Sequence, residues 1–322
     1  MTDSVTHEST KTTILDTIGQ TPLIPLRQMG HSHHAKLWVK LESHNPMGSI
    51  KDRVALAMIE QAEQDGVLKP GYTIVEPSSG NTAIALAMVA AVKGYNLIIT
   101  MPTLAHNEYK RILEHFGARV IETPARKQMQ GAIDKARSIV QNQPRCYMPQ
   151  QFHNVANPAV HQYQTAQEII QALPGTLDTF IAGVGTGGTL SGMIQACHTQ
   201  QLTTHIVAVE PERSQVLQGY KSQPHGLQGI GAGFIPPHID LDRVDQVMAC
   251  SEENALQTAQ QLARKEGILA GPSSGANVWV ALQIAKQRPA DHNIVTLICD
   301  GWERSSRMCS HHSVVPGIDF II

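Results

Sequence analysis

The chain lacks the charge pattern of a protein that binds polyanions. Aromatic residues make up only 4% of its 322 residues, its formal net charge is −2, and lysine and arginine are scattered without long runs. Proteins that bind nucleic acid or acidic membrane surfaces through charge carry a basic patch. We therefore expect neither nucleic acid nor a membrane as a partner.

Cysteine pairs and long apolar segments are absent as well. The five cysteines are widely spaced without a Cys-x-x-Cys pair, and no apolar run reaches membrane-spanning length. The N-terminal residues 1–13 are polar and include acids, unlike a signal peptide. These features favour a cytoplasmic protein without a disulfide framework.

Histidines cluster at residues 31–34 (His-Ser-His-His) and 310–312 (Ser-His-His). Imidazole is a common metal ligand. Both clusters lie near turn signals or the C-terminal tail, where a solvated loop is the simpler interpretation. We therefore assign no metal site.

Short apolar runs alternate with longer helical patterns along the chain. Strands are expected at residues 72–77, 96–102, 118–124, 145–150, 178–184, 205–211 and 293–300. Helices are expected at residues 81–94, 108–117, 131–141, 160–172, from about 188, 252–266 and 275–287. This alternation is typical of βαβ units with parallel sheets.

The alternation occurs twice, with a break near residue 155. The sequence therefore predicts an α/β protein with two domains, residues 1–155 and 156–322, each with a mostly parallel twisted sheet flanked by helices. The first strands, about residues 12–44, are candidates to cross to the sheet of the other domain. Ligands of such folds bind where parallel strands end, so we expect the active site between the domains.

Three loops that follow strands carry small polar residues. Residues 76–82 (Glu-Pro-Ser-Ser-Gly-Asn-Thr) precede a helix start and favour a carboxylate or phosphate, although a plain helix cap is the alternative. Residues 183–189 contain four glycines and two threonines and would surround a phosphate with backbone N–H groups. Residues 270–276 place two serines ahead of a helix, where a capped helix is again the alternative.

The second loop also permits a nicotinamide-dependent dehydrogenase. Gly183, Gly185 and Gly188 match the G-x-G-x-x-G pattern, and Glu210 follows about twenty residues later at a strand end, where a ribose-binding acid lies. This alternative leaves Lys51 and residues 76–82 without a role.

Lys51 completes a different set of groups. A lysine amine can form a Schiff base with an aldehyde, one loop suits a phosphate, a second suits a carboxylate, and a serine hydroxyl suits a ring nitrogen. These are the parts of an enzyme that uses pyridoxal 5'-phosphate.

Several segments resemble the fold-type II pyridoxal-phosphate enzymes, specifically the cysteine synthase (O-acetylserine sulfhydrylase) and cystathionine β-synthase family, with a tryptophan-synthase-β-like fold. The resemblance extends from about residue 18 to residue 304 in the expected order. It is carried by IGQTPL, ES-NP-GSIKDR, EPSSGNT, QQF-N-ANP, GVGTGGTLSG, AVEP, QGIGAGFIP and SSGA.

The resemblance implies a role for each matching residue. Lys51 is implied to be the Schiff-base lysine and the catalytic base, Asn81 to bind the cofactor ring hydroxyl, and Ser273 to face the pyridine nitrogen. The phosphate cup is implied to be Gly185, Thr186, Gly187, Gly188 and Thr189. The substrate site is implied to include Ser78, Ser79, Gly80, Asn81, Thr82 and Gln151 for the α-carboxylate, and Gly229, Gly231 and Ala232 as the wall near the nucleophile path.

The implied reaction is β-replacement on an activated L-serine through an aminoacrylate intermediate. A serine opposite the ring nitrogen gives a moderate electron sink, which suits loss of a good β-leaving group. O-acetyl-L-serine plus sulfide, giving L-cysteine and acetate, is the simplest case. O-phosphoserine as the donor, serine with homocysteine, and cyanide or an amine as nucleophile stay open.

Several positions depart from the family pattern. The loop after one strand reads Leu104-Ala105-His106 where the family has Thr-Met-Ser, Ala83 replaces a glycine, and Gln128 and Trp302–Ser305 also differ. These departures are expected near the second substrate, so they concern the nucleophile and not the cofactor. The family further implies a homodimer and a complex with serine acetyltransferase; Ile322 at the chain end could mimic that partner's tail, but a docked apolar terminus is the simpler interpretation.

Overall fold

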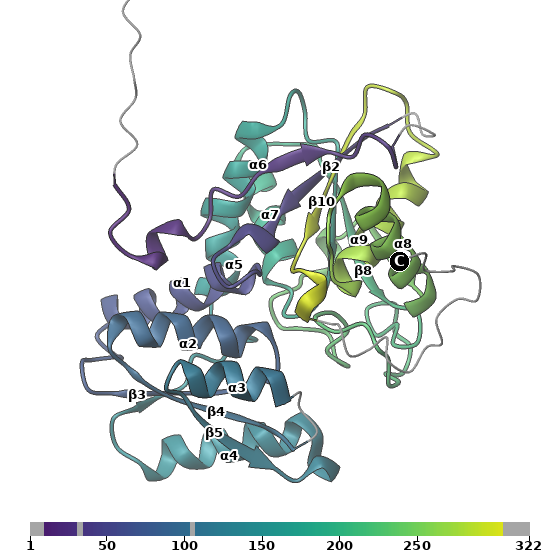
Figure 1. Ribbon diagram of the computed structural model, residues 1–322. Helices are drawn as coiled ribbons and strands as arrows, with labels where there is room; N and C mark the ends of the chain where they lie inside the picture. Colours follow the sequence, from purple (N-terminus) through teal and green to yellow (C-terminus); the bar gives the residue numbers. More distant parts are fainter. Residues whose placement is uncertain (1–9, 31–34, 104–106, 305–322) are drawn as a thin grey trace, which may run out of the picture. The chain divides into compact units, whose positions relative to one another are not determined.

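The computed structural model describes residues 10–30, 35–103 and 107–304, and they form two compact units (Figure 1). Unit 1 comprises the residues up to Gln20, Asn45–Met47 and Lys51–Pro149, and unit 2 comprises Thr21–His44, Gly48–Ile50 and the residues from Gln150 onward. The chain therefore passes between the units several times. Each unit is described by itself.

Unit 1 contains a four-stranded parallel sheet in the order β5-β4-β3-β6. Its strands are β3 (Thr73–Pro77), β4 (Asn96–Pro102), β5 (Arg119–Thr123) and β6 (Cys146–Tyr147). Its helices are η1 (Ile14–Thr17), α1 (Lys51–Gln64), α2 (Asn81–Lys93), α3 (Asn107–His115), η3 (Ala125–Lys127) and α4 (Gln128–Asn142).

Helices cover both faces of this sheet because its strands are apolar at successive positions. Ile74 and Ile99 belong to a core shared with α1, α2 and α3, whereas their neighbours Val75 and Ile98 pack with Ile139 of α4. Successive side chains of a strand point to opposite faces, so a continuous apolar run requires two covered faces.

Unit 2 contains a six-stranded sheet in the order β1-β2-β10-β7-β8-β9, in which β1 is antiparallel and the other neighbours are parallel. Its strands are β1 (Leu23–Pro25), β2 (Lys36–Leu41), β7 (Thr179–Gly183), β8 (His205–Pro211), β9 (Gln246–Cys250) and β10 (Asn293–Ile298). Its helices are η2 (Glu42–His44), α5 (Ala156–Val160), η4 (His161–Thr165), α6 (Ala166–Ala172), α7 (Gly188–Thr199), η5 (Leu241–Arg243), α8 (Glu252–Gln261), η6 (Leu262–Glu266), α9 (Pro272–Ala285) and η7 (Trp302–Arg304).

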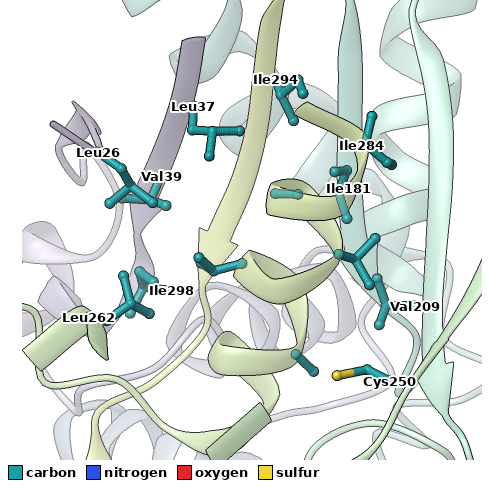
Figure 2. Close-up of a cluster of buried hydrophobic side chains, with 14 of the residues drawn as sticks. Leu26, Leu37, Val39, Ile181, Val209, Cys250, Leu262, Ile284, Ile294 and Ile298 are labelled. Carbon is teal, nitrogen blue, oxygen red and sulfur yellow. The ribbon is translucent and has the colours of Figure 1, made fainter. Parts of the chain in front are cut away.

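Two apolar cores lie on the two faces of the six-stranded sheet. Figure 2 shows one of them, where Ile181, Val209 and Ile294 from three strands meet Leu262 and Ile284 from helices. The other core combines alternate residues of the same strands with α6 and α7. Apolar side chains therefore cover both faces of the sheet, and polar residues that could bind a ligand are expected at the strand ends.

The predicted fold class is confirmed: parallel sheets flanked by helices make an α/β protein. The bounds of β4 and β8 are those expected at 96–102 and 205–211. The edge strand β9 was not expected, because its residues 246–249 are exposed or half-buried and give a weak apolar signal. The helix expected at 160–172 begins at Ala156 and includes the π-helical turn η4. Among the described residues, no helix has both the length and the apolarity to cross a membrane.

One buried ion pair joins β2 to α6. Lys40 Nζ lies 2.7 Å from Glu168 Oε2 and donates to the carbonyl oxygen of Thr21 at 2.6 Å. The Lys40 side chain is 2% exposed, whereas that of Glu168 is 20% exposed. Removing the carboxylate leaves a charge inside the protein, but removing the lysine leaves a carboxylate that water can reach.

We therefore expect Glu168→Ala to destabilise the protein more than Lys40→Met. The free energy of unfolding should fall by about 3 kcal/mol in Glu168→Ala, as for other broken buried pairs. Urea unfolding measures this change. Glu122→Ala is the control, because its partner Lys110 at 2.8 Å is more exposed and such pairs contribute less than about 1 kcal/mol. Equal losses for Glu168→Ala and Lys40→Met would contradict this asymmetry.

Candidate active site

In unit 2, the glycine-rich loop connects the end of β7 to the start of α7. β7 ends at Gly183 and α7 begins at Gly188, with Gly187 as its N-cap in the left-handed region at φ 82°. The first N–H groups of a helix have no acceptor inside the helix and carry partial positive charge. A helix start of this kind favours an anion, as the sequence predicted for this loop.

Close packing explains why this loop needs glycine. A Cβ atom at Gly185 would overlap the carbonyl oxygen of Gly229, and one at Gly188 would overlap Oδ1 of Asn157. At Gly187 a side chain would meet Ile239 and would also be strained by the positive φ. Side chains are thus excluded at these three positions, where the loop backbone packs directly against its neighbours.

The two threonines of the loop are held by polar neighbours from α5 and η4. Thr186 Oγ1 accepts a hydrogen bond from Nδ2 of Asn157 at 2.9 Å. Thr189 Oγ1 lies 3.3 Å from Nε2 of His161, whose Nδ1 lies 3.0 Å from the hydroxyl of Thr165. Both hydroxyls lie in or beside the first turn of α7, where they add polar groups to the N–H donors.

Ser273 lies in the first turn of α9 and is only 3% exposed. Within the described residues its hydroxyl has no hydrogen-bond partner. Gly229 lies beside it in the left-handed region at φ 90°, and a Cβ atom there would come within 3.6 Å of Ser273 Oγ. Because Gly229 also lies against Gly185, the structure brings the phosphate cup, Gly229 and Ser273 together.

The remaining predicted residues of unit 2 attach to the same loop. The N–H of Gly231 donates to the carbonyl of Val184 at 2.9 Å, and Ala232 follows it half-buried. Gln151 is buried, and its carbonyl oxygen accepts from Asn157 Nδ2 at 2.8 Å and is 3.2 Å from Nε2 of His238. Asn157 therefore links Gln151 to the cup.

In unit 1, Lys51 is the first residue of α1 and is half-buried. α1 packs against α2, whose first residue is Asn81. Lys51 and Asn81 therefore both lie at helix starts within unit 1, and the role of Lys51 as a nucleophile stays a prediction.

The loop Ser78–Thr82 connects β3 to α2 in the same unit. Gly80 is the N-cap of α2, and its carbonyl accepts from the N–H of Ala83 at 3.0 Å. The hydroxyl of Ser79 lies 3.6 Å from the sulfur of Met129. Like the loop of unit 2, this loop presents a helix start and small hydroxyl residues.

Some sequence predictions fall on residues that the structure does not describe. They are the histidine clusters at 31–34 and 310–312, the Leu104–His106 departure, Ser305 and Ile322. Within the described ranges, no group of three or more histidine, cysteine or acidic side chains could hold a metal ion.

Two buried asparagines that support the cup were not identified from the sequence. Asn157 contacts Thr186 as described, and Asn277 of α9 accepts the N–H of Gly183 on Oδ1 at 2.8 Å and donates from Nδ2 to the carbonyl of Leu297 at 3.2 Å. Both side chains are 0% exposed. Asparagine is usually a surface or turn residue, so its type alone gave no signal of these contacts.

Glu210 does not have the contacts that the dinucleotide alternative requires. It is 1% exposed, and its carboxylate accepts from the N–H of Leu217 at 2.8 Å and from Nε2 of Gln218 at 3.0 Å. Burial raises the pKa of this carboxyl, which the hydrogen bonds partly oppose. Both carboxylate oxygens of Glu210 are therefore engaged by the segment that follows β8.

The comparisons with known proteins agree with this class of site. Residues 14–300 match the family described as pyridoxal-phosphate dependent enzyme, so the chain belongs to that family. The donor set fits the cofactor's phosphate, because the loop at α7 offers N–H groups and hydroxyls without side chains in the way.

Individual relatives show which members of this family the chain is similar to. The chain is 46% identical over 292 residues to a cysteine synthase of Staphylococcus aureus, covering 90% of this chain and 94% of the relative. Among solved structures it resembles a cysteine synthase of Entamoeba histolytica with a TM-score of 0.92, 37% identity and coverage of 99% and 96%. It also resembles an O-acetylserine dependent cystathionine β-synthase of Helicobacter pylori with a TM-score of 0.85, 35% identity and coverage of 92% and 97%.

The environment of His238 predicts a pH dependence of stability. Burial lowers the pKa of His238, and it also lowers that of His292. The unfolded chain then binds protons that the folded protein does not, so stability is fully present above about pH 6.5 and is lost as the pH falls below it.

We expect the thermal midpoint to fall on acidification from about pH 6.5, and His238→Gln to reduce this slope while keeping a donor for Gln151. His198→Gln is the control, because that side chain is exposed. Thermal unfolding across this pH range measures the effect. An unchanged slope in His238→Gln would show that other groups cause it.

Proposed function

We propose that this protein is a pyridoxal-phosphate dependent transferase that converts O-acetyl-L-serine and sulfide to L-cysteine and acetate, in cysteine biosynthesis. The reaction breaks the bond from Cβ to the acetyl ester oxygen, acetate leaves with the electron pair, and a Cβ–S bond forms. The similarity to cysteine synthases over nine tenths of the chain supports this assignment.

One observation carries the proposal. The glycine loop at the start of α7 and the hydroxyl of Ser273, which has no partner among the described residues, lie together in unit 2 with Gly229 between them. A phosphate at the loop and a ring nitrogen at a neutral hydroxyl are the two ends of pyridoxal phosphate.

Each residue of the chain has a distinct task in this proposal. Bound pyridoxal phosphate supplies an electron sink for the negative charge at the substrate Cα. Lys51 Nζ would hold the cofactor through its aldehyde carbon and would move the substrate α-proton. Asn81 orients the ring through its hydroxyl, and Gly185–Thr189 hold the phosphate.

The substrate is held by its carboxylate. Ser78–Thr82 offer hydroxyls and the start of α2 to that group, and Gln151 adds its side-chain amide. Gly229, Gly231 and Ala232 would form the wall beside the substrate amino group and the path of the nucleophile.

A larger thiol is the second candidate nucleophile. The Helicobacter pylori neighbour is described as an O-acetylserine dependent cystathionine β-synthase, so a closely similar fold serves a thiol other than sulfide. For this chain, homocysteine in place of sulfide would give cystathionine from the same donor.

We also propose a cytoplasmic homodimer that can bind serine acetyltransferase. The four cysteines of the described part are all free, as in a reducing compartment. Unit 2 exposes apolar side chains at Val155, Tyr163, Phe234 and Ile235, which a second copy would cover. Light scattering of the purified protein tests the dimer.

Lys51→Ala should abolish both turnover and covalent attachment of the cofactor. After borohydride reduction, mass spectrometry of wild type should find a pyridoxyl group on Lys51, and the variant should carry none. Lys69→Ala, an exposed lysine of the same unit, is the control and should match wild type. A pyridoxyl group elsewhere in wild type would refute the assignment of Lys51.

Substitution of Ser273 should change kcat more than it changes the binding of the cofactor. Ser273→Ala should keep the cofactor and lose part of kcat, whereas Ser273→Asp should protonate the ring nitrogen and lose more. Visible spectra and kcat with O-acetyl-L-serine and sulfide measure the two effects. Equal kcat in all three proteins would mean that Ser273 has only a structural role in the first turn of α9.

Sulfide and homocysteine can be ranked directly. With O-acetyl-L-serine as the donor, we expect kcat/KM for sulfide to exceed that for homocysteine by at least about tenfold, or ~1.4 kcal/mol, in a cysteine synthase. The reverse ranking would make cystathionine formation the better assignment. Serine and O-phosphoserine as donors are the controls for the leaving group.

A further inference from the structure

Asn157 is a buried amide between two parts of the candidate site. It lies in α5, its side chain is 0% exposed, and Nδ2 donates to the carbonyl of Gln151 at 2.8 Å and to Thr186 Oγ1 at 2.9 Å. Its Oδ1 lies against Gly188, where any added side chain would overlap it. No role was assigned to this residue from the sequence.

The orientation of this amide follows from its neighbours. A backbone carbonyl can only accept hydrogen bonds, so the atom beside the Gln151 oxygen must be the amide nitrogen. The same nitrogen faces Thr186, and the hydroxyl oxygen therefore accepts. The N–H of Gly188 approaches the same oxygen at 3.4 Å.

This contact determines where the Thr186 proton can go. A hydroxyl has one proton and two acceptor positions. With N–H groups on the oxygen from Asn157 and Gly188, its proton points away from both. No acceptor for it occurs among residues 10–30, 35–103 and 107–304.

We propose that Asn157 is a positioning residue that makes the Thr186 hydroxyl a hydrogen-bond donor to the cofactor phosphate. This inference rests on the proposed function, because the phosphate is the anion at the start of α7. By holding the Gln151 carbonyl with the same nitrogen, Asn157 also places that residue relative to the cup.

A double-mutant cycle on the holoenzyme tests the inference. Asn157→Leu keeps the branched shape without hydrogen bonds, and Thr186→Val removes the hydroxyl. Equilibrium dialysis against pyridoxal phosphate gives the Kd, and phosphorus NMR reports the environment of the bound phosphate. We expect each single variant to raise the Kd about tenfold, since the lost bond is to a charged group, and each to shift the phosphorus signal.

The cycle distinguishes action through Thr186 from a general defect. If Asn157 acts through Thr186, the double variant should also bind about tenfold more weakly than wild type, because the second change removes nothing further. A product of the two effects, about a hundredfold, would mean independent roles and would overturn the inference. Asn157→Leu with the wild-type Kd and phosphorus signal would overturn it too.

Asn293→Leu is the matched control for loss of a buried amide. Asn293 is the first residue of β10 and is 3% exposed, whereas Asn277 contacts Leu297 near the last residue of that strand. Nδ2 of Asn293 donates to the carbonyl of Thr176 at 3.0 Å, and its Oδ1 accepts from Nε1 of Trp38 at 3.1 Å. This variant should lower the thermal midpoint and leave the phosphorus signal unchanged. An equal shift in this control would overturn the inference, because it would show a non-specific effect.

Asn157→Asp covers the case in which Asn157→Leu does not fold. The carboxylate keeps the shape of the amide but accepts the Thr186 proton, so it should weaken binding and shift the phosphorus signal; unchanged values would overturn the inference. A wild type that binds no pyridoxal phosphate would refute the proposed function together with this inference. A wild type that binds it at Lys51, with Asn157 variants unchanged, would refute the inference alone.

Discussion

The requirement that both faces of each parallel sheet be buried governs the rest of the molecule. In β8, Ile206 packs on one side and Val207 on the other, and the neighbouring strands repeat this alternation. A polar group buried on such a face costs free energy unless it has a hydrogen-bond partner. Chemistry is therefore confined to the loops after the strands, where helix starts offer unpaired N–H groups.

The α7 loop itself offers no charged side chain to an anion, because residues 183–189 include none. In the proposed function, the loop would hold the cofactor phosphate with N–H groups and hydroxyls whose orientation is set before the ligand arrives. Asn277 holds the start of the loop at Gly183, and Asn157 holds its middle at Thr186. Burial strengthens these contacts and makes each unpaired group costly.

Much of the fold could be predicted from local patterns. Continuous apolar runs located β4 and β8, and glycines located helix ends, as at Gly94, which ends α2 in the left-handed region at φ 75°. The order of strands could not be predicted this way. β2 pairs with β10, more than half the chain away, because pairing depends on the packing of both faces and leaves no local pattern.

The sequence by itself determined the α/β class and the family, and it predicted two anion-binding loops, because these depend on short stretches with a fixed order of residue types. Only the tertiary structure decided which groups meet. It placed Gly229 between Gly185 and Ser273, and it turned Asn157 from an ordinary polar residue into a buried donor for Thr186. The direction of a hydrogen bond depends on atoms from distant segments, and residue type alone cannot specify it.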